Sequence, residues 1–144
     1  HYTKRSASSH HLSSKGASMR RVINPEKAPK PRGVYSPGVV ASGFVFVSGQ
    51  GALNPETNEM EFGDIKSETR RVLRNIQAIL ETAGSSLQEI VKLGVFLADL
   101  NDFAAMNEVF REFFPSDPPA RTTVGVQLPL PKMKVEIDCI ARVP

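Results

Sequence analysis

The sequence predicts an α+β sandwich, in which a sheet of four or more strands carries two helices on one face and leaves its other face open. Two observations predict this class. The hydrophobic period changes along the chain in the order ββ–α–β–α–ββ. The two segments of helical period each present one apolar stripe, which is typical of helices that pack on a sheet.

The first two strands form a hairpin. A short apolar run at residues 39–41 is followed by the turn pair Ser42 and Gly43, and then by a strand over residues 44–48. Gly49 begins the break after this strand. The hairpin is therefore the expected start of the sheet.

Two helices follow from capping residues and apolar spacing. Asp64 is a good N-cap for the first helix, and Gly84 supplies its C-terminal stop. Asn101 or Asp102 is expected to cap the second helix, which Pro115 ends. The first stripe contains Ile65, Val72, Leu73, Ile76, Ile79, Leu80 and Ala83, and the second contains Phe103, Met106, Phe110 and Phe113.

The remaining strands are expected at residues 90–97, 122–126 and 135–141. In the last of them, alternation separates two faces. One face carries Val135, Ile137, Cys139 and Ala141, and the other carries Glu136, Asp138, Ile140 and Arg142. The second face is mixed in polarity, which suits a subunit contact or a binding site better than bulk water.

Composition narrows the function classes. The 144 residues suit one soluble domain, and no apolar run approaches the length of a membrane span. The only cysteine, Cys139, shares a face with apolar residues and is read as a core residue, with no intrachain disulfide. All three histidines lie in the first eleven residues, so none is left in the body for a metal cluster or a Ser/His/Asp triad.

The N-terminal residues 1–18 differ from the rest of the chain. They are rich in serine, hold three of the 18 basic residues and contain no acid, so we expect a tail that packs no core. Met19 is a possible native start, and the tail is then an expression remnant or an organelle-targeting segment. The single domain comprises residues 19–144, in the cytoplasm, or in a mitochondrion or other organelle if the tail is a targeting remnant. Its first part, residues 24–37, is proline-rich and predicts an extended lead-in.

Charge disfavours a nucleic-acid partner. The 15 basic residues outside the tail match the 15 acidic residues of the chain, so the body is neutral. A nucleic-acid-binding domain usually concentrates positive charge on its fold. We therefore do not expect nucleic acid among the partners. Because no apolar run is long enough to span a membrane, we expect no membrane partner either.

Arg121 stands where a proline-rich loop turns into the β-branched residues of a strand. Such a junction favours a fixed side-chain position. An arginine is costly there unless its planar guanidinium has an anion to bind. The alternative is an ordinary surface arginine at the end of a strand.

Several motifs in combination resemble the YjgF/RidA family, also called the endoribonuclease L-PSP family. The resemblance runs from about Asn24 to Val143 and is carried by Ser48-Gly49-Gln50, the helix beginning near Asp64, Asp99-Leu100-Asn101-Asp102-Phe103 with Asn107, Pro119-Ala120-Arg121 and Val135-Glu136-Ile137. It implies a chorismate-mutase-like mixed sheet with two helices on one face, and a homotrimer with three sites at its subunit interfaces. It also implies a cofactor-free deaminase that hydrolyses enamine and imine intermediates of the 2-aminoacrylate type to 2-oxo acids and ammonia.

Two alternatives stay open at this point. Some members of the family are described as endoribonucleases or translation inhibitors, although the neutral body argues against that activity here. A non-catalytic trimer that binds small carboxylates is the other alternative. It also needs Arg121, so the residues do not separate it from the deaminase.

The resemblance assigns catalytic roles to two residues. Arg121 matches the family's substrate-binding arginine, and its two-point clamp suits the carboxylate of a 2-imino acid. Glu136 matches the glutamate of the family motif, and its carboxylate can hold the attacking water or shuttle a proton to nitrogen. The alternative for Glu136 is a glutamate on the polar side of an edge strand.

Four further residues are assigned to substrate binding. Tyr35 resembles the aromatic residue that closes the family's pocket, or it anchors the lead-in loop. Gly49 allows close backbone approach, or it simply ends a strand. Asn107 supports the site or bonds to nearby backbone. Thr123 alternates to the same side as Arg121 and orients water, or it is a β-branched strand residue.

The chain departs from the family pattern in three places. Val34 replaces a proline that often precedes the tyrosine, and Gly51 with Ala52 replaces an aliphatic residue and a proline. These changes leave the arginine and the glutamate in place. They put the shape of the pocket wall, and hence the range of substrates, in question.

Overall fold

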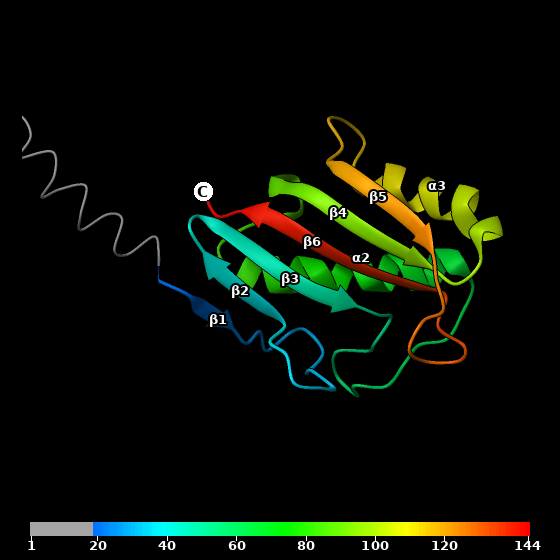
Figure 1. Cartoon of the computed structure of the whole chain (residues 1–144), viewed down its shortest axis with the longest axis horizontal. Helices are drawn as coiled ribbons and strands as arrows, with labels where there is room; N and C mark the ends of the chain where they lie inside the picture. Colours follow the sequence, from blue (N-terminus) through cyan, green and yellow to red (C-terminus); the bar gives the residue numbers. More distant parts are fainter. Residues whose placement is uncertain (1–18) are drawn as a thin grey trace, which may run out of the picture.

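The protein, seen here as a computed structural model that describes residues 19–144, is built on a mixed sheet of six strands (Figure 1). The expectations for the tail, residues 1–18, lie outside this range. The strand order is β1-β2-β3-β6-β4-β5, and only β4 and β5 run parallel. The strands are β1 (Arg21–Ile23), β2 (Gly38–Ala41), β3 (Phe44–Gln50), β4 (Ile90–Leu97), β5 (Ala120–Gly125) and β6 (Val135–Arg142).

The predicted hairpin is β2 and β3. Ser42 and Gly43 have φ values of 52° and 82°. Positive φ at both central residues is the geometry of two-residue turns that match the twist of the flanking strands. A further strand, β1, precedes this hairpin at the edge of the sheet. We did not predict it, because it has only three residues and follows no turn signal. The folded body thus begins at Arg21 rather than at Gly38.

Helix α2 (Ile65–Thr82) begins and ends where the sequence predicts. An oxygen of the Asp64 carboxylate accepts a hydrogen bond from the Ser67 amide at 2.8 Å, and Gly84 has a φ of 83°. All seven residues of the predicted stripe are buried. This stripe is the main contribution of α2 to the core.

Helix α3 (Phe103–Phe113) begins differently from the prediction. Asp102 makes no capping hydrogen bond, because a 3-10 turn, η2 (Leu100–Asp102), precedes the helix. Asp99 caps that turn instead, with its carboxylate accepting from the Asn101 amide at 2.9 Å. Phe103 is also not a core residue: the residue is 40% exposed, whereas Val109 is buried. A second 3-10 turn, η1 (Leu87–Glu89), joins α2 to β4.

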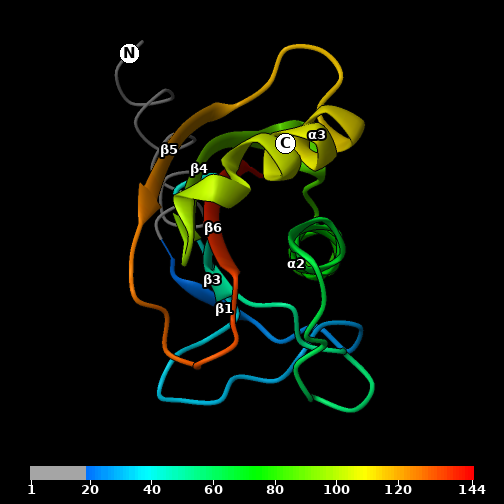
Figure 2. The ribbon, with the colours of Figure 1, turned by 90° about the vertical axis from the view of Figure 1, so that its right-hand side faces the viewer.

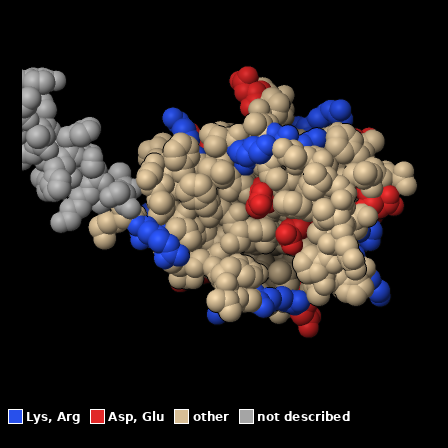
Figure 3. Space-filling view, viewed as in Figure 1, with Lys and Arg blue, Asp and Glu red and all other residues tan. Residues whose placement is uncertain are grey.

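Both helices cover the same face of the sheet, as the sequence predicts (Figure 2). Alternate residues of β6, from Val135 to Ala141, are buried against them. The opposite face, which we call the open face, is largely uncharged over its area (Figure 3). Its exposed apolar residues include Val22, Phe44, Phe46 and Val124.

The lead-in, residues 24–37, is more than an extended segment. It turns at residues 26–28, and Ala28 joins the hydrophobic core with 2% exposure. Its last part runs beside the end of β3, where the Ser48 amide donates to the Pro37 carbonyl at 3.0 Å. These contacts bring Tyr35 next to the sheet.

Candidate functional site

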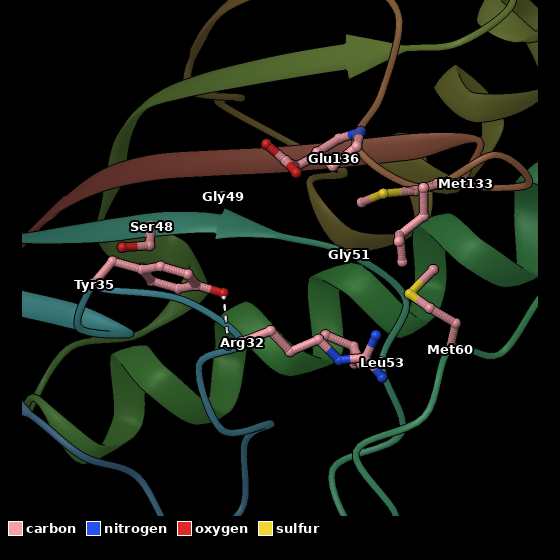
Figure 4. A pocket seen from close by; sticks show the side chains of 11 residues that line it. Arg32, Tyr35, Ser48, Gly49, Gly51, Leu53, Met60, Met133 and Glu136 are labelled. Carbon is pink, nitrogen blue, oxygen red and sulfur yellow. Dashed lines mark hydrogen bonds between the residues drawn. The ribbon is translucent and has the colours of Figure 1, made fainter.

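Two hollows contain the predicted site residues. The first, which we call the Glu136 pocket, has a volume of about 390 Å³ and is lined at its polar end by Tyr35, Ser48, Gly49 and Glu136 (Figure 4). The second, which we call the Arg121 hollow, has a volume of about 440 Å³ and is lined by Asn107, Phe110, Pro119 and Arg121 among others.

The Glu136 pocket depends on an irregularity in β3. The pairing of β3 with β6 shifts between Val47 and Gln50, so Ser48 and Gly49 lie at a bulge. Bulges redirect side chains and interrupt the ladder of backbone hydrogen bonds. The Ser48 hydroxyl donates to the Ser36 carbonyl at 2.6 Å, which ties the bulge to the lead-in.

Gly49 lies directly against the catalytic candidate. A Cβ atom on Gly49 would lie 2.5 Å from Oε2 of Glu136, closer than real Cβ contacts allow. Any side chain at this position would displace the carboxylate. Glycine therefore permits the close approach of the Glu136 carboxylate to β3.

The Glu136 carboxylate is half-buried and makes no hydrogen bond or ion pair with another side chain in residues 19–144. Burial raises its pKa, and the negative charge of Asp138 on the same strand raises it further. Both effects disfavour the ionised form. A carboxylate in this condition accepts a proton more readily than an ordinary glutamate and suits proton transfer at moderate pH.

Tyr35 stands at the mouth of the Glu136 pocket. Its side chain is 47% exposed, and its hydroxyl accepts a hydrogen bond from the Arg32 amide at 3.3 Å. The ring lies beside Ser48 in the close view (Figure 4). The residue is thus held by its own loop while one side of the ring stays free.

Arg121 lies on the helix side of the sheet, at the edge strand β5. Its guanidinium carbon is 4.8 Å from the ring centre of Phe110 and 5.6 Å from that of Phe103. The salt bridges of the described residues do not include it. Burial lowers the pKa of Arg121, but an arginine stays charged at neutral pH. A desolvated guanidinium held on aromatic rings is well prepared to bind a carboxylate.

Two polar neighbours of Arg121 also have free bonding capacity. Asn107 lines the Arg121 hollow, and its side-chain amide has no hydrogen bond within residues 19–144, so the alternative of a bond to nearby backbone is not seen. The hydroxyl of Thr123 is buried and lacks a partner in the same range. Thr123 pairs with Val95 and Arg121 pairs with Leu93, so both face the helices, as alternation predicts.

The structure does not bring the two catalytic candidates together in one chain. Arg121, Asn107 and Thr123 lie on the helix side of the sheet, whereas Glu136, Gly49 and Tyr35 lie at the other hollow. One chain therefore holds two separate half-sites. Each half-site has an unsatisfied charge and an opening to the surface.

Sequence reasoning missed several pocket residues. Ser48 belonged to a motif that we noted, but its hydroxyl was given no role. Arg32, Met60 and Met133 come from irregular segments with no periodic signal, so nothing in their spacing points to a pocket.

Other chemistries find no support in the described residues. No group of three histidine, cysteine, aspartate or glutamate side chains in residues 19–144 is arranged to hold a metal ion. Burial raises the pKa of the Cys139 thiol to about 12, so Cys139 is a core residue and not a nucleophile. Within the same range, no helix has the length and apolarity needed to cross a membrane.

Known proteins match nearly the whole described chain. Residues 25–143 match the model of the family described as Endoribonuclease L-PSP. A RutC family protein of Pyrococcus abyssi is 52% identical over 123 residues, 85% of this chain and 96% of that protein. The 2-iminobutanoate/2-iminopropanoate deaminase of Dermatophagoides farinae is 43% identical over 124 residues, with 85% and 96% covered.

A solved structure agrees with the observed fold. The crystal structure of E. coli TdcF with bound serine is similar with a TM-score of 0.79 at 40% identity, covering 85% of this chain and 98% of that one. The α+β fold predicted from the sequence, a mixed sheet with two helices on one face, is thereby confirmed.

Proposed function

We propose, from the premise that this chain belongs to the Endoribonuclease L-PSP family, that it hydrolyses reactive enamine and imine intermediates of the 2-aminoacrylate type to 2-oxo acids and ammonia. One observation carries the proposal. Arg121 and Glu136 are half-buried, opposite charges, and neither has a counter-ion among the described residues. A cation for a carboxylate and a base for water are what this hydrolysis needs.

We further propose that the two half-sites meet between subunits of a homotrimer. Because they open on opposite sides of the sheet, a second copy is needed to place Arg121 near Glu136. The exposed Phe44 and Phe46 give the open face an apolar surface that assembly would bury. Closed cyclic symmetry then gives three identical sites per trimer.

The chemistry follows from these positions. A proton from solvent water adds to C3 of the enamine and gives the protonated imine. Arg121 holds the carboxylate of the imino acid with two hydrogen bonds, while Asn107 and Thr123 supply further polar contacts. Water then adds to C2 as Glu136 accepts one of its protons.

Collapse of the adduct completes the reaction. Glu136 returns the proton to nitrogen and then accepts the proton of the C2 hydroxyl as the C2–N bond breaks, so that ammonia leaves and the 2-oxo acid forms. Ammonia takes up this last proton as ammonium. Water is the only co-reactant. The printed names of two relatives support this substrate class: the deaminase of Dermatophagoides farinae acts on 2-imino acids, and TdcF is described with bound serine.

A polyanionic substrate is less well supported, although the family description mentions an endoribonuclease. The 15 basic and 15 acidic residues of the body balance, whereas RNA binding favours an excess of positive charge. A small acid fits both hollows by size, and its carboxylate matches the positive charge of Arg121. The deaminase is therefore the function that we assign.

A coupled assay tests the proposal. A serine dehydratase generates 2-aminoacrylate, and the decay of its absorbance is followed with and without this protein. We expect decay faster than the spontaneous rate and proportional to protein concentration. Decay equal to that with albumin, together with measurable binding of 2-oxobutanoate, would instead assign a non-catalytic carboxylate-binding protein.

A further inference from the structure

We infer that the Glu136 pocket receives 2-imino acids with long apolar side chains, and that Gly51 sets the size of the side chain that fits. This inference rests on the proposed function and concerns the same site. The pocket wall beyond Glu136 is apolar. That end of the pocket is lined by Leu53, Met60, Leu130 and Met133.

Gly51 lies between the polar and the apolar ends of the pocket (Figure 4). A Cβ atom here would lie 2.6 Å from Cε of Met133 and 3.7 Å from Sδ of Met60. The first distance is too short for a real contact, so a side chain at Gly51 would push the end of Met133 into the cavity. The absence of a side chain therefore keeps the apolar end open.

The backbone does not require glycine at this position. Gly43 and Gly84 have positive φ values, whereas Gly51 does not, so its conformation is open to other residues. Its carbonyl accepts hydrogen bonds from the Leu53 amide at 2.9 Å and from the Asn75 side chain at 3.3 Å, which any residue would preserve. The lack of a side chain at Gly51 instead leaves space for a ligand in the Glu136 pocket.

The distance between the two ends suits a side chain of moderate length. Gly49 touches Glu136, and Gly51 follows it by two residues. Two residues of extended chain span roughly 6.6 Å. A methionine side chain measured from the reacting carbon has about this reach, and the shorter leucine side chain fits within it.

The two methionines make the apolar end adaptable. Met133 is buried and Met60 is partly buried, and both direct sulfur toward Gly51. Methionine is flexible and polarisable, so it adjusts to apolar groups of different shape. We therefore expect a class of substrates, the 2-imino acids of leucine and methionine type, rather than a single one.

Arg32 offers the competing interpretation. It lines the same pocket, and its guanidinium donates to the Asn58 carbonyl instead of an acid. A substrate with a second carboxylate would use it. The apolar lining favours an apolar side chain, and the experiment below includes the acidic one.

The experiment compares substrates and a matched pair of variants. A D-amino acid oxidase generates the imino acids of alanine, leucine and methionine, and their hydrolysis is measured against 2-aminoacrylate. We expect the parent to show a higher kcat/KM for the two large imino acids. Gly51→Val should lower kcat/KM for these at least about tenfold more than it lowers kcat/KM for 2-aminoacrylate.

The double variant Gly51→Val with Met133→Ala restores space at the clash and should recover most of the lost activity on large substrates. Binding of 4-methyl-2-oxopentanoate, 2-oxobutanoate and 2-oxoglutarate supplies a readout independent of turnover. We expect the first to bind most tightly to the parent and to lose affinity in Gly51→Val.

Three results would overturn the inference. They are a parent that prefers the small imino acids, a Gly51→Val variant that loses small and large substrates equally, and tightest binding of 2-oxoglutarate. Each of these three results is compatible with imine hydrolysis and therefore does not contradict the proposed function. A parent that hydrolyses no imine at all overturns the proposed function and this inference together.

Discussion

Arg121 and Glu136 lie on opposite faces of the sheet in one chain. Arg121 pairs with Leu93, which is buried against the helices, and Glu136 pairs with Phe96 on the other face. Paired residues of neighbouring strands point to the same side, so the two charges are separated by the sheet itself. A site that uses both must draw them from two subunits.

Arg121→Lys should impair imine hydrolysis severely while the fold stays intact. Lysine keeps the charge but loses the planar two-point clamp and the stacking on Phe110. Misplacement of a small substrate by ~1 Å costs on the order of a hundredfold in rate. Steady-state kinetics with 2-aminoacrylate checks this, with circular dichroism as the control for folding. A variant that works at the parent rate would make Arg121 an ordinary surface residue.

Glu136→Gln should separate binding from turnover. Glutamine keeps the size of the side chain and some of its hydrogen bonding, but it cannot act as a base. We expect the affinity for 2-oxobutanoate to stay within about threefold and the turnover to fall on the order of a hundredfold or more. Calorimetric titration and the coupled assay measure the two quantities. Equal losses in affinity and in turnover would assign Glu136 to binding alone.

The pH dependence should report the raised pKa of Glu136. As the pH falls through this pKa, the base becomes protonated, so activity should be lost at a higher pH than for an ordinary glutamate. Asp138 is the second cause of the shift, after burial. Asp138→Asn should lower the pKa of Glu136 and move the acid limb of kcat/KM to lower pH. An unchanged limb would mean that another group controls it.

The parts of the fold that follow from local rules were predictable from the sequence. The cap at Asp64, the turn at Ser42 and Gly43 and the stop at Gly84 each depend on a few neighbouring residues, and all three are confirmed. The family was also predictable, because its motifs are specific in combination. Strand β1 was not, because three residues carry too weak a pattern.

The site was predictable only in part, for a physical reason. The alternation that puts Thr123 beside Arg121 is local, and the register confirms it. The Glu136 pocket instead depends on packing between distant segments, with Met60 and Met133 meeting at Gly51. Such contacts leave no periodic trace in the sequence. The roles of the six predicted site residues stay predictions until the variants are measured.

Asn75→Ala should destabilise the wall of the Glu136 pocket. The amide of Asn75, a buried residue of α2, donates to the carbonyls of Gly51 and Leu53 at 3.3 and 2.8 Å. Loss of the amide leaves the Leu53 carbonyl without this donor, although the Gly51 carbonyl keeps its bond from the Leu53 amide, and should lower the free energy of unfolding by about 1–3 kcal/mol. Thermal and urea unfolding measure this, with the partly exposed Gln77→Ala on the same helix as the control. Equal stability of the two variants would contradict the role of Asn75.

Mixed assemblies should restore activity from two inactive variants. If each site takes Arg121 from one subunit and Glu136 from the next, Arg121→Ala and Glu136→Gln damage different halves of every site. In trimers formed from an equal mixture, about a quarter of the interfaces combine two intact halves, by the symmetry of a closed ring. The mixture, unfolded and refolded together, should then reach about a quarter of the parent rate.

Each variant treated alone is the control and should stay inactive, and light scattering should give a mass of about three chains for all samples. Recovery cannot occur if both residues act within one subunit, because every subunit then carries one defect. A trimer with no recovery would place the complete site in a single chain, and a monomer would remove the interface altogether. Recovery in the mixed trimer alone would locate the reaction between subunits, as we propose from the opposite faces that Arg121 and Glu136 occupy in one chain.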